Sequence, residues 1–158
     1  MAVSRVQRRI AVGSPFANPQ VAAVTYKLRG EKIKAALLMN PGKIILCPRQ
    51  SGKSISLAGY MMENYPDGAI VFTINERTAK EFNRMLSKEY FKKSIIVYGP
   101  QNPPFFMDEN LPIFADEFFG LIGVVQKAIV RDRRFTGAVG SVMGGAIIEE
   151  VRNRCIPY

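Results

Sequence analysis

The chain has 158 residues, of which 47% are hydrophobic, and this suits a single domain with one core. Lys and Arg outnumber Asp and Glu by 22 to 13, so the net charge is +9, which favours a polyanionic partner, nucleic acid ahead of a membrane surface. The absence of histidine excludes a His-ligated metal site and a Ser-His catalytic pair, and the two cysteines match no zinc or redox spacing.

Residues 1–20 have the composition of a basic arm, because Arg5, Arg8 and Arg9 are followed by glycine and proline without any sustained period. A nucleic-acid-binding arm and a solvated tail are both compatible with it. We expect residues 21–158 to form one domain. The apolar runs are shorter than the roughly 20 residues that a membrane-spanning helix needs, and the start is a poor secretory signal. The sequence therefore predicts a cytoplasmic protein without a membrane partner.

The rest of the chain alternates between strand and helix patterns. Short apolar and β-branched runs predict buried parallel strands at 43–47, 69–74, 94–99, 111–115 and 133–140. Helical periodicity predicts helices toward the end of 21–40 and at 53–64, 75–91, 118–130 and 144–155. Prolines predict an irregular linker at 100–110. This alternation is typical of an α/β fold, with helices layered on a mainly parallel sheet.

The stretch CPRQSGKS at 47–54 ends like the phosphate-binding loop G-x-x-x-x-G-K-[ST], although Cys47 stands in place of its first glycine. The predicted strand before it and helix after it are the context that such a loop requires. There, backbone N–H groups and the helix N-terminus face a phosphate, Lys53 reaches the β- and γ-phosphates, and Ser54 holds Mg²⁺. The predicted cofactor-binding residues are Arg49, Gln50, Ser51, Gly52, Lys53 and Ser54. The alternative is a chance GKS.

A nucleoside triphosphatase also needs an acidic pair at the end of another strand. Asp116 and Glu117 follow the apolar run 111–115, so we expect Asp116 to serve the metal and Glu117 to orient or deprotonate the attacking water. Asp108 and Glu109 form a rival pair, which is less favoured because it follows two prolines and only three apolar residues. For both pairs, the alternative is a solvated acidic turn.

A third candidate lies beyond the acidic strand. In RRFTGAVGS, Thr136 and Gly137 are expected to end a strand, where a hydroxyl could sense the γ-phosphate. A simple turn is the alternative, because Thr-Gly at a strand end is usually one.

The segments RQSGKS, AIVFTINERTAKEF, IFADEF and FTGAVGS, in this order, resemble the ATPase core of phage terminase large subunits and related viral DNA-packaging motors. The resemblance covers residues 30–145. It implies a P-loop NTPase-like three-layer sandwich of the additional-strand type, with a strand between the loop strand and the strand before it in order. It also implies ATP and Mg²⁺ as cofactors. Carried over by position, it implies phosphate and magnesium contacts from Lys53 and Ser54. It implies metal and catalytic carboxylates at Asp116 and Glu117, and a coupling role for Thr136. Arg49 would be a loop arginine that helps to neutralise γ-phosphate charge in cis; the alternative for Arg49 is a surface cation or a partner of a helix end.

The resemblance favours an ATP-hydrolysing motor domain that acts on double-stranded DNA in the cytoplasm of a bacterial host. Its expected partners are further copies in a homo-oligomeric ring, or a separate nuclease, portal or small terminase subunit, because terminase large subunits usually continue into a nuclease domain, for which this chain has no room. The alternative is a non-catalytic nucleic-acid-binding or virion assembly protein that keeps the P-loop fold. A small-molecule kinase is the least favoured, because it usually needs the complete glycine loop.

Overall fold

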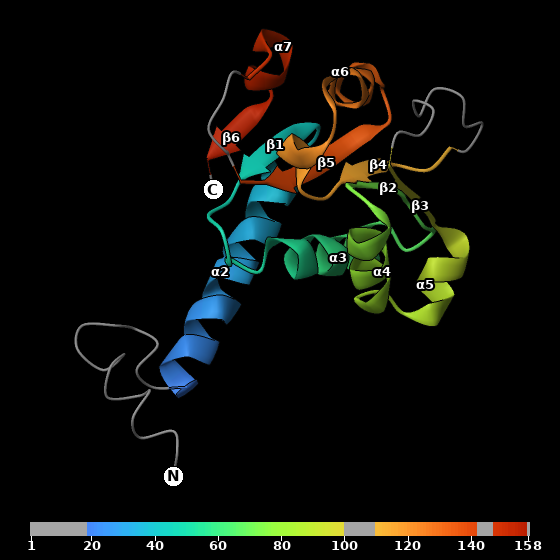
Figure 1. The fold of residues 1–158 in the computed structure, drawn as a ribbon. Helices are drawn as coiled ribbons and strands as arrows, with labels where there is room; N and C mark the ends of the chain where they lie inside the picture. The colour runs from blue at the N-terminus through green and yellow to red at the C-terminus, as the bar shows by residue number, and fades with distance from the viewer. Residues whose placement is uncertain (1–18, 100–109, 142–146, 158) are drawn as a thin grey trace.

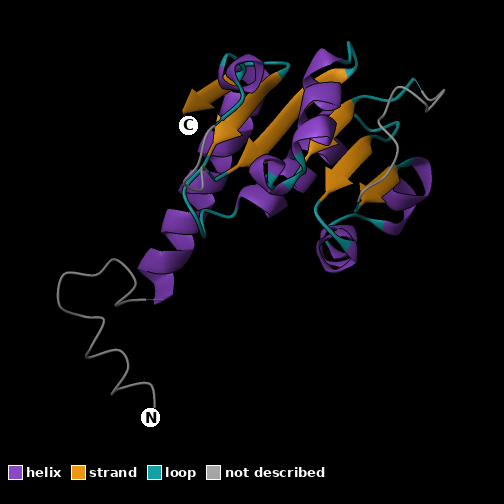
Figure 2. Cartoon of the chain, turned by 45° about the horizontal axis from the view of Figure 1, so that its top comes forward, coloured by secondary structure: helices purple, strands orange, loops and turns teal. Residues whose placement is uncertain are grey.

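The computed structural model describes residues 19–99, 110–141 and 147–157, with side chains from residue 29 onward. Within these ranges, helices cover both faces of a single six-stranded sheet (Figures 1 and 2). Arg5, Arg8 and Arg9 of the predicted arm, and the rival acids Asp108 and Glu109 in the predicted linker, lie outside the described residues.

All strand pairs in this sheet are parallel, as the apolar runs predicted. The strands are β1 (Lys43–Leu46), β2 (Ile70–Thr73), β3 (Ile95–Tyr98), β4 (Ile113–Ala115), β5 (Phe135–Gly140) and β6 (Cys155–Pro157). Their order is β3-β2-β4-β5-β1-β6. Because the strands are parallel, their carboxyl ends meet at one edge of the sheet and their amino ends at the opposite one. We call these the carboxyl edge and the amino edge.

The helices divide between the two faces, with α2, α3 and α4 on one side and α6 and α7 on the other (Figure 1). Their bounds are α2 (Pro19–Met39), α3 (Lys53–Asn64), α4 (Glu76–Arg84), α5 (Lys88–Lys93), the 3₁₀-helix η2 (Phe118–Gly120), α6 (Gly123–Arg131) and α7 (Glu149–Arg152). This arrangement confirms the predicted α/β class.

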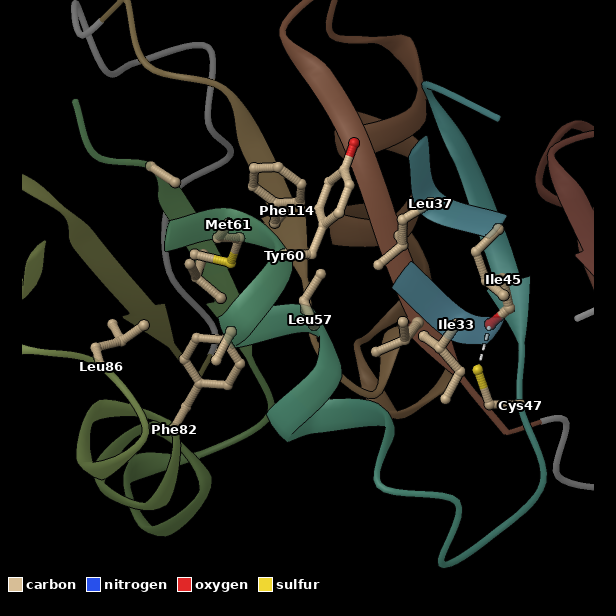
Figure 3. Close-up of a cluster of buried hydrophobic side chains, with 14 of the residues drawn as sticks. Ile33, Leu37, Ile45, Cys47, Leu57, Tyr60, Met61, Phe82, Leu86 and Phe114 are labelled. Carbon is tan, nitrogen blue, oxygen red and sulfur yellow. Dashed lines mark hydrogen bonds between the residues drawn. The ribbon is translucent and has the colours of Figure 1, made fainter. Parts of the chain in front are cut away.

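Two hydrophobic clusters hold these layers together, one on each face of the sheet. Successive strand residues alternate between the clusters: Ile45 joins Ile33 and Leu37 of α2 on one face, while Ile44 joins Ile129 of α6 on the other. Figure 3 shows the α2 and α3 side. An ion pair of 2.7 Å between Lys34 Nζ and Glu63 Oε1 also joins α2 to α3. These contacts hold α2, α3 and α6 in position against β1, whose end leads into the predicted loop.

The structure corrects four predicted helices. The helix expected only toward the end of 21–40 is α2, which begins at Pro19, inside the range predicted for the arm. The helix expected at 75–91 is divided, because Ser87 begins a new helix, α5, by accepting a hydrogen bond from the Tyr90 backbone N–H. The helix expected at 118–130 begins as η2, and α6 follows only from Gly123. The helix expected at 144–155 is reduced to α7 among the described residues, and the following segment pairs with β1 as the unpredicted strand β6.

Among the described residues, no helix combines the length and the apolar character needed to cross a membrane.

Candidate functional site

The predicted phosphate loop connects the end of β1 to the start of α3, as its sequence context required. Gly52 adopts a left-handed conformation with φ 74°, which favours glycine, and it precedes the first residue of α3. No side chain caps this helix. The backbone N–H groups of its first turn lack partners within the helix and carry the positive end of its dipole, so this end of α3 is suited to an anion.

Cys47, at the first position of the loop, is a buried structural residue. Its side chain is 4% exposed, and its backbone N–H donates to the Gly140 carbonyl oxygen at 2.9 Å, which ties the loop to β5. Burial raises the pKa of the Cys47 thiol to about 11, so it stays neutral. Cys47 does not have a positive φ; among the described non-glycine residues, that conformation occurs at Gln50 and Glu117. The backbone at Cys47 therefore does not require glycine.

The acidic pair lies at the end of β4, on the same edge of the sheet as the loop. The Asp116 backbone N–H donates to the Phe72 carbonyl oxygen of β2 at 2.9 Å, which fixes the end of this strand. Glu117 has φ 49°, an uncommon conformation for a residue with a side chain, and it turns the chain into η2.

Two direct contacts join the loop to the acidic pair. Lys53 Nζ forms an ion pair with Glu117 Oε1 at 2.8 Å, and Ser54 Oγ donates a hydrogen bond to Asp116 Oδ1 at 2.7 Å. The strand order explains this reach, since β5 alone separates β1 from β4 and strands lie about 4.8 Å apart, which gives a span of roughly 10 Å. Two consecutive residues of α3 therefore meet the two consecutive residues that the sequence predicted.

Asp116 is the more deeply buried carboxylate, at 5% exposed. Burial raises its pKa from 3.8 to about 6, against the opposing effect of the Ser54 hydrogen bond, while the neighbouring Glu117 raises it further and Lys53 lowers it. A carboxylate of this kind is stabilised by a cation, so Asp116 and the Ser54 hydroxyl offer two adjacent oxygen donors of the type that Mg²⁺ prefers.

The structure does not bring Thr136 to this site. Thr136 is the second residue of β5 rather than the end of a strand, and its backbone carbonyl accepts a hydrogen bond of 2.8 Å from the Gly42 N–H at the amino edge. The interpretation of FTG as a strand end is therefore wrong, because the strand continues to Gly140.

The hydroxyl that follows β5 on the carboxyl edge belongs to Ser141, which no sequence motif indicates. Ser141 comes directly after Gly140, the residue hydrogen-bonded to Cys47, and is 7% exposed. Within the described ranges, its Oγ has no hydrogen-bond partner, and neither has the Oγ of Ser51 in the loop, which is 0% exposed. Buried hydroxyls without partners are rare, and two of them lie in segments at this site.

The remaining loop residues, Arg49 and Gln50, are exposed. Within the described ranges, no three acidic or cysteine side chains gather as a metal-ligand cluster. A Ser-Asp pair with the uncapped end of α3 nevertheless fits a magnesium ion that is carried by a phosphate, because such an ion keeps most of its ligands as water and phosphate oxygens.

Comparison of the chain with protein-family models, with curated proteins and with solved structures found no match.

Proposed function

We propose that this chain is an ATP-binding and ATP-hydrolysing P-loop domain of the terminase-like, DNA-packaging type, acting on double-stranded DNA. The observation that carries the proposal is the pair of contacts from Lys53 to Glu117 and from Ser54 to Asp116. The order of the sheet supports the proposal, because β5 lies between the loop strand β1 and the acidic strand β4, which is compatible with the additional-strand type.

In this proposal, the chain's own residues divide the work of phosphate binding and water activation. Lys53 and the backbone N–H groups at the start of α3 bind the phosphates, and Ser54 and Asp116 hold Mg²⁺. The magnesium ion supplies charge neutralisation for the phosphate oxygens when bound. Glu117 orients the attacking water and accepts its proton, while ATP and water become ADP and phosphate.

Lys53 connects binding to catalysis, because its ammonium group contacts Glu117 and its side chain is only 10% exposed. A phosphate that reaches the loop competes with the Glu117 carboxylate for this ammonium group. We infer that phosphate binding frees Glu117 to contact water, so that the carboxylate acts only when a nucleotide is present. In this proposal, Arg49, which is exposed on the same loop, adds positive charge beside the phosphates.

The test is phosphate release by the purified chain with Mg-ATP, with and without double-stranded DNA, compared with Lys53→Ala. We expect turnover by the wild type and at least a ~100-fold loss in the variant, because general-base and phosphate-positioning groups contribute factors of that order. Release that is equal in the two proteins would overturn the proposed activity.

The second candidate is a non-catalytic nucleic-acid-binding or virion assembly protein. The observation that favours it is the ion pair of Lys53 with Glu117, because this pair already neutralises the charge that a phosphate would need. Calorimetric titration with ATP separates the two functions. Absent nucleotide binding, together with salt-sensitive DNA binding, would select the non-catalytic protein.

A further inference from the structure

The amino edge of the sheet carries a group of cations that the proposed nucleotide site does not use. β5, β1 and β6 are neighbours in the sheet (Figure 1), and basic residues stand at or just before the start of each. We call them the amino-edge cations: Lys43, Arg133, Arg134, Arg152 and Arg154. The phosphate loop and the acidic pair lie at the carboxyl edge, so the two groups are at opposite ends of the strands.

Hydrogen bonds join the amino ends of these three strands to one another. Arg154 Nη1 donates to the Gly42 carbonyl oxygen at 3.0 Å, and the Gly42 N–H donates to the Thr136 carbonyl oxygen at 2.8 Å. Thr136 Oγ1 in turn donates to the Arg134 carbonyl oxygen at 2.9 Å. The start of β1 is thereby joined to the segments that lead into β5 and β6.

Acidic side chains neutralise only part of this edge. Asp132 is paired with Arg134 at 2.9 Å, and Glu150 with Arg131 of α6 at 2.7 Å. Among the described residues, Lys43, Arg133 and Arg152 have no ion pair, and Glu149 is the acid of α7 that remains unpaired. Arg133 and Arg152 are exposed. The surface therefore keeps an excess of positive charge that faces solvent.

The spacing of these cations suits the phosphates of a nucleic-acid strand. Three adjacent strand ends extend over roughly 10 Å, and phosphates follow one another at about 3.4 Å along the axis of each DNA strand. The edge is thus wide enough for two or three successive phosphates. At the carboxyl edge, by contrast, Asp116 and Glu117 would repel a second polyanion.

We propose that double-stranded DNA binds through its phosphates along the amino edge, at the ends of β5, β1 and β6 and away from the phosphate loop. The inference rests on the proposed function for its choice of partner. Two consequences follow from the placement. Binding is independent of DNA sequence, because phosphates carry no base information, and a nucleotide in the loop does not compete with DNA.

The experiment measures binding of the full chain to a fluorescent DNA duplex over a series of salt concentrations, for the wild type and for the double variant R133A/R152A. These arginines are exposed and form no ion pair in the described structure. Arg152 Nη2 donates a 3.4 Å hydrogen bond at the surface to the Ile147 carbonyl oxygen, so replacement of the two arginines leaves the core intact. The matched control is R84A/K88A, which removes the same charge from exposed positions in α4 and α5.

We expect R133A/R152A to bind roughly 10- to 100-fold more weakly at about 0.1 M salt, with the slope of log K against log salt reduced by about two. The control should bind like the wild type, both variants should keep the wild-type rate of ATP hydrolysis, and a non-hydrolysable ATP analogue should not displace DNA. Equal weakening of the two variants, displacement by the analogue, or loss of binding only on replacement of Arg5, Arg8 and Arg9 would each overturn the proposed surface.

The result also separates this inference from the proposed function. ATP hydrolysis without any DNA binding by the wild type would refute DNA as the partner but leave the ATPase standing. DNA binding that R133A/R152A weakens, without hydrolysis, would support the surface and refute the ATPase. Stronger binding to anionic lipid vesicles than to DNA, lost in R133A/R152A, would replace the proposed partner by a membrane surface and overturn the inference.

Discussion

Ser54 and Asp116 are 62 residues apart in the sequence, and Ser54 Oγ donates a 2.7 Å hydrogen bond to Asp116 Oδ1. The contact joins the first turn of α3 to the end of β4, where the Asp116 side chain is almost fully buried. The Asp116 carboxylate accepts hydrogen bonds from two neutral donors, the Ser54 hydroxyl and the Glu117 backbone N–H, but the effect of burial is larger, so the charged form is poorly stabilised. The site therefore holds an electrostatic cost in the absence of a cation, and this cost can be measured.

Asp116→Asn should be more stable than the wild type at pH 8, without divalent cations. Burial raises the Asp116 pKa from 3.8 to about 6, which corresponds to roughly 3 kcal/mol at about 1.4 kcal/mol per pKa unit. The wild type has its full stability below pH 3.8, where Asp116 is protonated in both the folded and the unfolded state, and loses this contribution as the pH rises through about 6. Urea unfolding at pH 4 and pH 8 measures the difference.

The amide of the variant can still accept the Ser54 hydrogen bond, so the comparison isolates the charge. We expect the gain in unfolding free energy to be large at pH 8 and close to zero at pH 4. A gain of the same size at both pH values would show that ionisation of Asp116 is not its cause.

Glu117→Gln should bind ATP but hydrolyse it at least ~100-fold more slowly, because the amide cannot accept a proton from water. Glu109→Gln, in the rival pair, should keep the wild-type rate. Phosphate release under saturating ATP, with nucleotide binding measured separately, compares the two variants. A selective loss in Glu109→Gln would transfer the catalytic role to the rival pair.

The sequence is sufficient to predict the residues of the candidate site that directly follow a recognisable buried strand. A buried run followed by Asp116 and Glu117, and a second run followed by the loop, place both groups at the same edge of any parallel sheet. The contacts of Lys53 and Ser54 follow from that placement once β5 separates β1 from β4. The strand order itself depends on long-range pairing, which local patterns do not contain.

Local sequence patterns also fail to predict the position of Thr136 inside β5 and the existence of β6. Thr-Gly is typical of turns, which favours a strand end at Thr136, yet Gly137 lies inside β5, where a Cβ would stand only 3.1 Å from Leu37 Cδ2. The three residues of β6 have no period of their own and form a strand only by pairing with β1. Tertiary contacts decide both cases.

In the proposed site, the Ser141 hydroxyl follows β5 on the carboxyl edge and, with no partner among the described residues, is free to donate to a bound phosphate. Ser141→Ala should therefore lower the rate of ATP hydrolysis at least ~10-fold without reducing stability. The Ser141 hydroxyl is buried beside the loop without a partner, so its removal costs no hydrogen bond and relieves an unsatisfied polar group by about 1 kcal/mol. Thr136→Ala is the matched control at the amino edge, and it should lose the 2.9 Å bond to Arg134 but keep the rate. A loss of rate in Thr136→Ala, together with the wild-type rate in Ser141→Ala, would support the γ-phosphate-sensing role that the sequence motif predicts for Thr136.

Cys47→Gly restores the first glycine of the phosphate-loop pattern. It should lower the free energy of unfolding and should not raise the rate of ATP hydrolysis. Cys47 packs in the cluster with Ile33 and Leu37 (Figure 3), and its Sγ donates to the Ile45 carbonyl oxygen at 3.5 Å. Removal of the buried side chain and the added freedom of glycine together cost about 2 kcal/mol. Urea unfolding and phosphate release, measured with Cys47→Ala as control, test both expectations.

Alanine keeps the Cβ and the ordinary backbone preference, so Cys47→Ala should lie between the wild type and Cys47→Gly in stability. The backbone at Cys47 has no positive φ, unlike that at Gln50, so glycine relieves no strain there. A faster enzyme on substitution by glycine would mean that the cysteine side chain obstructs the phosphates. The expected result, an unchanged or lower rate, identifies Cys47 as part of the core that anchors the loop to β5 through the Gly140 hydrogen bond.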